Sequence, residues 1–286
     1  MDVHCAEYWT IDLRRAAADA LDRAFLGPFQ EETLARLLYA LESPLRCAEL
    51  RGLPGTGKTL LLDWLAGHCA RSDQWVARID LTGMGRAETV GALGVALGVT
   101  GFTGEALGPL WRGVCDRLAG LNLAGRRGVI IADHLDDAQP EAALEIARLV
   151  RLPMAGFTVC VARRQPRGVA PRECCDDALM DLADLRVELR PLATEQVGGY
   201  LAARWPSSRD SGALFTEAAC DSMLAATGGV PRRIDRLSEL CLLAGFVAEQ
   251  PIVDASVVVS VAEAEGMLSH HSTPRVFEPV VLSRAS

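Results

Sequence analysis

The feature that most constrains this 286-residue chain is an eight-residue stretch, Gly52-Leu53-Pro54-Gly55-Thr56-Gly57-Lys58-Thr59. It matches the pattern G-x-x-x-x-G-K followed by Ser or Thr, whose glycines let successive backbone N–H groups turn inward around phosphate oxygens. Lys58 is the single lysine among the 29 basic residues of the chain. An ammonium group is a compact point charge, whereas guanidinium is a broad planar fork suited to bidentate contacts. The stretch therefore holds the one side-chain ammonium group of the chain where a phosphate-binding loop needs it.

The residues on both sides of this stretch fit a P-loop, which joins a strand to a helix in nucleotide-binding proteins. Residues 46–51 are short and extended in character. After the motif, apolar side chains recur at helical spacing at Leu60, Leu61, Trp64 and Leu65. This helix would direct its positive dipole end at the anion. We therefore predict that nucleotide phosphates lie against residues 52–60, with Lys58 on the β- and γ-phosphates and the Thr59 hydroxyl on Mg²⁺.

Composition indicates a globular protein, since half of the residues are hydrophobic and can bury a sizeable core in one large domain or two modest ones. No apolar run approaches the roughly 18 residues of a membrane helix, and the segment from Met1 to Thr10 is not a basic stretch followed by an apolar one. The nine cysteines are scattered, odd in number and without a C-x-x-C pair, which favours reduced thiols over disulfides or a zinc site. We therefore expect a soluble, cytoplasmic protein with no integral membrane segment.

A net charge of −8 weighs against broad nonspecific binding to nucleic acid or anionic lipid. A local basic patch is the exception, because four arginines follow an expected strand closely, at Arg163, Arg164, Arg167 and Arg172. Two interpretations of this patch are equally open, namely solvated loop residues and a contact to phosphate or DNA. Binding to nucleic acid is therefore an alternative that the overall charge does not favour.

The order of the expected elements favours an α/β fold. Strand-like segments occur at residues 46–51, 74–81, 128–133, 157–162 and 185–189, and helical patterns alternate with them. From Thr194 onward only helices are expected, at residues 194–205, 216–226, 232–248 and 254–265. This pattern predicts a P-loop parallel sheet sandwiched by helices, followed by a C-terminal all-helical lid subdomain. We place the nucleotide-binding core at residues 1–190, the helical lid at 191–266 and a loose tail at 267–286.

Asp133 ends the apolar segment Gly128-Val129-Ile130-Ile131-Ala132, which is typical of a strand buried on both faces. A carboxylate at this point after a P-loop is expected to be the Walker B residue, which organises the water shell of Mg²⁺ opposite the Thr59 hydroxyl. ATPases of this layout usually have Glu at the next position, as a base for the attacking water, whereas this chain has His134. A neutral imidazole can accept a proton near pH 7, but its shape and reach differ from those of a carboxylate. We expect His134 to slow hydrolysis without abolishing nucleotide binding.

Asp136 and Asp137 are nearby alternatives to His134 as the base. They also precede a helix expected to begin near Pro140, and a favourable interaction with the N-terminal dipole of that helix is the preferred interpretation. A catalytic role for either carboxylate is the weaker alternative.

Segments in both halves of the chain match one family. They are Tyr8-Trp9-Thr10-Ile11, Pro28-Phe29, Glu32-Thr33-Leu34-Ala35-Arg36-Leu37, the P-loop, Arg186-Val187-Glu188-Leu189-Arg190-Pro191-Leu192 and Tyr200-Leu201. These segments resemble AAA+ ATPases of the general secretion pathway protein A (ExeA-like) type. The stretch Thr227-Gly228-Gly229-Val230-Pro231-Arg232-Arg233-Ile234-Asp235-Arg236-Leu237 is similar to the family signature G-x-P-R-x-I-N-x-L. The resemblance extends to about Glu265, and transposition helper ATPases of the same branch look similar.

The resemblance implies a five-stranded ATPase core with a helical lid. In this family the arginine after the proline of the lid signature is sensor 2, which contacts the nucleotide phosphates, and Arg232 matches it, with Arg233 as the fallback. An arginine suits this role because its planar fork makes bidentate contacts with phosphate. The competing interpretation of Arg232 is a cation at a helix start without a ligand. The sensor 1 position, at the end of the fourth strand, falls on Arg163 or Arg164.

Together these features predict an AAA+ type P-loop ATPase that binds ATP and Mg²⁺ between sheet and lid. The predicted catalytic residues are Lys58, Asp133, His134 and Arg232, and the predicted metal ligands are Thr59 and Asp133. Hydrolysis would be coupled to movement of the lid and of neighbouring subunits, in a homo-oligomer or with a protein partner. Two alternatives stand beside this prediction: an ATP-dependent switch or scaffold with little hydrolysis, motivated by His134, and a DNA-associated transposition-type helper, motivated by the basic patch.

Overall fold

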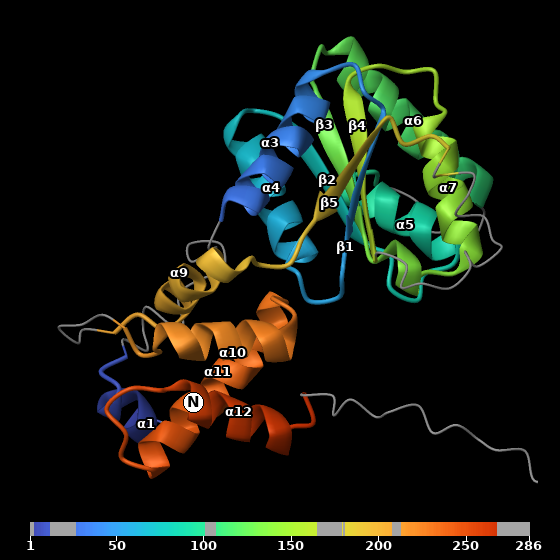
Figure 1. Ribbon diagram of the computed structural model, residues 1–286. Helices are drawn as coiled ribbons and strands as arrows, with labels where there is room; N and C mark the ends of the chain where they lie inside the picture. The colour runs from blue at the N-terminus through green and yellow to red at the C-terminus, as the bar shows by residue number, and fades with distance from the viewer. Residues whose placement is uncertain are drawn as a thin grey trace, which may run out of the picture.

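The structure is a computed structural model that describes residues 3–11, 27–100, 107–164, 179, 181–207 and 213–267. Its centre is a five-stranded parallel sheet with the strand order β2-β3-β4-β1-β5 (Figure 1). The strands are β1 (Cys47–Gly52), β2 (Trp75–Asp80), β3 (Gly128–Asp133), β4 (Phe157–Arg164) and β5 (Leu185–Leu189). The predicted parallel sheet is therefore confirmed, and β1, which leads into the P-loop, lies between β4 and β5.

Helices cover both faces of the sheet. Successive side chains of a strand point to opposite faces, and the strands have apolar side chains on both, so each face needs a cover. These helices are α3 (Pro28–Glu42), α4 (Lys58–Arg71), α5 (Arg86–Ala96), α6 (Leu107–Leu123) and α7 (Pro140–Val150). α3 and α4 pack against the face that contains Val129 and Ile131 of β3. α5, α6 and α7 pack against the face that contains Ile130 and Ala132 (Figure 1). All residues of β3 are buried, as its apolar sequence predicts.

Among the described residues, the C-terminal part of the chain is a bundle of helices with a core of its own (Figure 1). The helices are α9 (Thr194–Arg204), α10 (Glu217–Thr227), α11 (Pro231–Val247) and α12 (Ala255–Ala264). α11 buries Ile234, Leu237, Cys241 and Leu242, whose spacing places them on one helix face. The predicted all-helical subdomain after the sheet is confirmed.

The first described residues pack against this bundle and not against the sheet. α1 (Val3–Tyr8) precedes Trp9, whose side chain is fully buried. Trp9 Nε1 donates a hydrogen bond to the Leu242 carbonyl oxygen at 2.9 Å. A Cβ at Gly245 would lie 2.9 Å from the Trp9 ring, so the glycine leaves space for the indole. By their contacts these residues belong to the bundle, whereas the sequence-based division places them in the nucleotide-binding core.

A double-glycine turn sets the start of α11. Gly228 ends α10 with a φ of 63°, and Gly229 follows with a φ of 71°. Both angles lie in the left-handed region that favours glycine at a helix end. A Cβ at Gly229 would also lie 2.2 Å from the Leu192 carbonyl oxygen. Pro231 then begins α11, where its fixed φ suits the first helical turn.

No helix within the described ranges is both long enough and apolar enough to span a bilayer. Of the expected tail, only Met267 lies among the described residues, and it packs against the bundle. Arg167 and Arg172 of the predicted basic patch also lie outside the described residues.

Candidate nucleotide-binding site

The P-loop connects β1 to α4 as the sequence predicts, and its glycines meet different demands. Gly55 and Gly57 have φ angles of 86° and 97°, in the left-handed region where a side chain is strained. Gly57 is also the N-cap of α4, which begins at Lys58. At Gly52 the constraint is steric, since a Cβ there would lie 2.8 Å from the Leu189 carbonyl oxygen. The backbone thus forms a tight turn at a helix N-terminus, an arrangement that binds anions.

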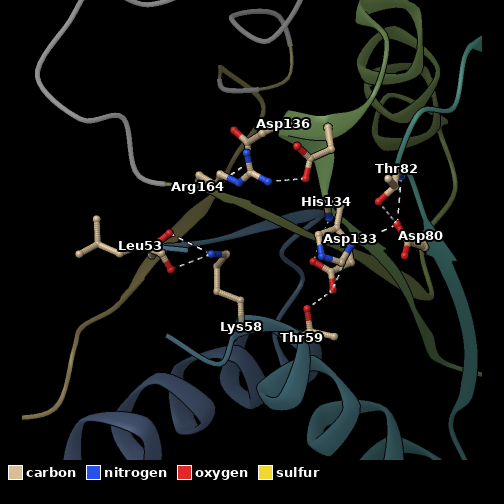
Figure 2. A network of polar contacts seen from close by, with 11 residues as sticks. Leu53, Lys58, Thr59, Asp80, Thr82, Asp133, His134, Asp136 and Arg164 are labelled. Carbon is tan, nitrogen blue, oxygen red and sulfur yellow. Dashed lines mark hydrogen bonds and ion pairs between the residues drawn. The ribbon is translucent and has the colours of Figure 1, made fainter. Parts of the chain in front are cut away.

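Lys58 folds back onto this turn (Figure 2). Its Nζ donates hydrogen bonds to the carbonyl oxygens of Gly52 at 2.9 Å and Leu53 at 3.2 Å. Burial lowers the pKa of the ammonium group, and the carboxylates of Asp136 and Asp133 oppose that shift. The cation is therefore held at the loop, where phosphate oxygens that enter the turn would meet it.

The two predicted metal ligands lie together at the carboxyl edge of the sheet. Thr59 Oγ1 donates a hydrogen bond to Asp133 Oδ2 at 2.7 Å, although the two residues are 74 positions apart in the sequence. Asp133 ends β3 and is only 2% exposed. Mg²⁺ prefers oxygen ligands and is usually held by one or two protein groups together with substrate phosphates and water. A hydroxyl and a buried carboxylate in contact fit this requirement.

His134 follows Asp133 in a left-handed backbone conformation, with φ 58° and ψ 38°, which is uncommon for a residue other than glycine. Its backbone N–H donates to Asp133 Oδ1 at 2.8 Å. Its ring Nδ1 lies 3.1 Å from Asp80 Oδ1. The structure therefore brings His134 to the edge of the predicted site, and it adds a carboxylate partner that sequence reasoning missed (Figure 2).

Asp80 is the last residue of β2 and lies opposite Asp133 in the parallel register of β2 and β3. The backbone N–H and the hydroxyl of Thr82 both donate to Asp80 Oδ1, at 3.0 and 2.7 Å. These hydrogen bonds, led by that of the hydroxyl, lower the pKa of the Asp80 carboxyl. The available signal was a carboxylate at the end of an expected strand, but the neighbour of that strand does not follow from the sequence order.

Asp136 and Asp137 hold the end of β4 and do not lie in the first turn of α7. They belong to a short 3-10 helix, η1 (Leu135–Asp137), whereas α7 begins at Pro140. The Asp136 carboxylate accepts a hydrogen bond from the Arg164 backbone N–H, and Asp137 Oδ2 lies 2.6 Å from Arg164 Nη2. These contacts replace the preferred interpretation that the two carboxylates serve the dipole of α7.

Both described arginines of the predicted basic patch are paired with carboxylates at the end of β4. In addition to the Arg164 contacts, Arg163 Nε lies 3.3 Å from Oε1 of Glu49, which is fully buried in β1. Arg51 and Arg186 contact the same carboxylate. A buried charge is costly unless it is paired, so these arginines compensate Glu49.

Arg232 lies against the P-loop. Its backbone N–H donates to the Gly55 carbonyl oxygen at 3.2 Å. A Cβ at Gly55 would lie 2.9 Å from Arg232 Cβ and 3.2 Å from Val230 Cγ1. Arg233, by contrast, bonds through its backbone N–H to Val230 within its own turn. The start of α11 is therefore in direct contact with the predicted phosphate-binding loop, at the residue that the lid signature singles out.

No protein-family model matches this sequence, and no curated protein matches it. Solved structures match its fold. Cdc6p from Pyrobaculum aerophilum is 14% identical with a TM-score of 0.66, and the match covers 92% of this chain and 73% of that chain. The Aeropyrum pernix ORC1 protein in complex with DNA is 21% identical with a TM-score of 0.59, covering 88% and 68%. Drosophila ORC bound to DNA is 15% identical with a TM-score of 0.67, covering 94% and 67%.

At these identities the similarities describe the fold alone. The chain has the fold of the AAA+ ATPases, in which a P-loop parallel sheet lies between helices and is followed by a helical lid. The predicted fold class is therefore confirmed.

Proposed function

We propose that this chain is a P-loop ATPase of the AAA+ type, which binds Mg-ATP between its sheet and its helical lid and couples hydrolysis to movement of the lid or of subunits. The observation that carries this proposal is the hydrogen bond between Thr59 and Asp133 beside Lys58. This hydrogen bond joins the P-loop to the end of β3. The P-loop is also in contact with Arg232. Within the class, the lid signature around Arg232 supports the ExeA-like branch.

Each side chain has a separate role in this proposal. Lys58 neutralises phosphate charge while the backbone N–H groups of residues 52–60 orient the phosphates. Thr59 and Asp133 would hold Mg²⁺, which when bound neutralises charge on the β- and γ-phosphates. Arg232 would contact the phosphates with its guanidinium and so connect the nucleotide to the bundle.

ATP turnover and nucleotide binding by the purified protein test the proposal, together with the Lys58→Ala variant. We expect turnover at saturating Mg-ATP that falls by about 100-fold or more in this variant, because it removes a preorganised charge from the reacting phosphates. Arg112→Ala, which changes an exposed cation of α6, is the control and should keep wild-type turnover. A wild-type protein that neither binds nor hydrolyses ATP would refute the proposal.

His134 favours a second form of this function, an ATP-dependent switch or scaffold with little hydrolysis. The imidazole stands where ATPases of this layout have a carboxylate base. If the imidazole limits the reaction, His134→Glu should raise kcat and leave nucleotide affinity unchanged. Unchanged turnover in this variant would remove the interpretation that His134 slows hydrolysis.

We also propose a division of the chain into a nucleotide-binding core at residues 27–190 and a lid that combines residues 191–266 with residues 3–11. The lid meets the P-loop through Val230 and Arg232, so a nucleotide that moves the loop would shift the bundle. A homo-oligomer or a protein partner would receive this movement. The described cysteines are free thiols, most of them buried, which supports a reducing compartment such as the cytoplasm.

A DNA-associated helper ATPase of the transposition type is the second candidate, and we favour it less. Two of the similar structures are of proteins in complex with or bound to DNA. Against this candidate stand the net charge of −8 and the pairing of Arg163 and Arg164 with carboxylates. DNA binding that needs ATP and weakens steeply with salt would support it, and the absence of binding at low salt would remove it.

A further inference from the structure

We propose that an open cavity at the amino edge of the sheet, where the strands begin, binds a small molecule through its phosphate or carboxylate group. The cavity has a volume of about 450 Å³ and is lined by residues 42–46, residues 155–158 and part of the stretch 122–127. These residues belong to the turn from α3 to β1, the start of β4, and the end of α6 with the turn that follows it. The volume lies within the range of small-molecule sites in proteins.

The cavity is separate from the proposed nucleotide site. Arg46 in its lining directly precedes β1, whereas the P-loop begins at Gly52, the last residue of this strand. A strand rises about 3.3 Å per residue, so the length of β1 places the two sites roughly 20 Å apart. In Figure 1 the cavity lies at the end of the sheet away from the helical bundle. A ligand in this cavity would therefore contact none of the residues proposed to bind Mg-ATP.

Two arginines of the lining are oriented by backbone carbonyl oxygens. The Arg127 guanidinium donates hydrogen bonds to the carbonyl oxygens of residues 41–43 at the end of α3, at 3.2, 2.9 and 3.1 Å. Arg46 Nη2 donates to the carbonyl oxygens of Val150 at 3.2 Å and Leu152 at 2.8 Å, at the end of α7. A helix C-terminus favours a nearby cation, but its carbonyl groups have only partial charge. Both guanidinium groups are therefore held in place, while their full positive charges are not neutralised there.

In the part of the chain that the structure describes, neither of these guanidinium groups forms an ion pair with a carboxylate. The Asp184 carboxylate accepts hydrogen bonds from the backbone N–H groups of Arg46 and Cys47, at 2.7 and 3.0 Å. Burial lowers the pKa of the Arg46 guanidinium, and the charge of Asp184 opposes this shift. An oxyanion in the cavity would likewise stabilise the charged form of Arg46.

The lining is positively charged and retains unused hydrogen-bond donors. Its described residues include three arginines and one carboxylate, Glu42, which give a formal net charge of +2. The third arginine, Arg126, lies 3.4 Å from Asp73, but the Asp73 side chain is 99% exposed, so solvent weakens this ion pair. Arg46 Nε is buried and, like the side chain of Asn122, has no hydrogen-bond partner among the described residues. Because guanidinium groups bind phosphate and carboxylate oxygens bidentately, these donors define the class of ligand.

Isothermal titration calorimetry with inorganic phosphate and with citrate, at constant ionic strength, tests the cavity without nucleotide. We expect saturable binding of at least one of these anions by the wild type and also by Lys58→Ala, whose P-loop has lost its cation. Arg126→Glu should weaken this binding by about 10-fold or more, because it reverses a charge of the lining. Ser43→Glu, which adds a negative charge to the lining and leaves every arginine in place, should have the same effect. Arg112→Glu, the same charge reversal at an exposed residue of α6 outside the lining, is the control and should bind as the wild type does.

Three results would each overturn the proposal. They are no saturation of the wild type up to about 10 mM of either anion, loss of binding in Lys58→Ala, and equal weakening in Arg112→Glu. The second result would place the anion in the P-loop, and the third would mean a general effect of charge. If circular dichroism shows that Arg126→Glu is unfolded, Ser43→Glu decides. A wild type that does not bind ATP would refute the proposed ATPase function and leave these measurements unaffected, since they use no nucleotide.

Discussion

Gly55 is the residue at which the P-loop contacts the start of α11. Its φ of 86° strains any side chain, and a Cβ would also lie 2.9 Å from Arg232 Cβ. Gly57 has a similar φ of 97°, but a Cβ there would meet nothing within 4 Å. An alanine at Gly57 therefore measures the free-energy cost of the backbone conformation alone. An alanine at Gly55 adds the cost of the clash with α11.

We expect Gly55→Ala to reduce the free energy of unfolding more than Gly57→Ala does. The left-handed conformation should cost about 1–2 kcal/mol in either variant. Gly55→Ala should lose about 1–3 kcal/mol more, because the methyl group is forced against the first turn of α11. Urea unfolding of the two variants beside the wild type measures the difference. Equal losses would mean that the lid does not rest on Gly55 in solution.

The sequence identified Lys58, Thr59 and Asp133 because each belongs to a motif with fixed spacing or ends an apolar run. Asp80 belongs to no motif of this kind. Its contact with His134 depends on β2 lying beside β3 and on the left-handed backbone of His134, and both features arise only in the folded chain.

Among the elements, strand β3 was the most predictable, with the expected bounds of residues 128–133, because it is apolar throughout and buried on both faces. β4 continues to Arg164, beyond the expected end at residue 162. Ion pairs of Arg163 and Arg164 with carboxylates of β1 and η1 hold this extension, and a hydrophobic pattern does not report them. α1 was not expected, since its six residues are too few for a helical period and depend on the burial of Trp9 beside them.

Trp9→Ala tests whether α1 is part of the lid. The variant removes a fully buried indole and its hydrogen bond to Leu242, so the free energy of unfolding should fall by about 3–5 kcal/mol. Tyr39→Ala, at a residue of α3 that is 63% exposed, is the aromatic control and should change it by about 0.5 kcal/mol or less. Denaturant unfolding followed by circular dichroism gives both values. A loss in Trp9→Ala no larger than that of the control would mean that the segment is detached in solution.

At the scale of the whole molecule, the sheet and the bundle meet where α11 contacts the P-loop. If Mg-ATP binds at this junction, hydrogen exchange should slow both in the peptide that covers residues 52–60 and in the one that covers residues 227–237. The peptide of α3 should be unaffected, and Lys58→Ala should remove both effects. Protection confined to the loop would show that the lid does not respond to the nucleotide. Mass spectrometry of exchanged, digested protein makes this comparison.

The packing of residues 3–11 with α11 makes the sheet an insertion within the sequence of the bundle. During synthesis Trp9 leaves the ribosome before the strands of the sheet do, whereas Leu242, its hydrogen-bond partner, follows 233 residues later. Among the described residues every strand has been made by Leu189, so the sheet can form while Trp9 still lacks the helix that it packs against. The order of synthesis therefore allows the sheet to fold before the bundle, and Trp9 stays exposed to solvent until α11 has been made.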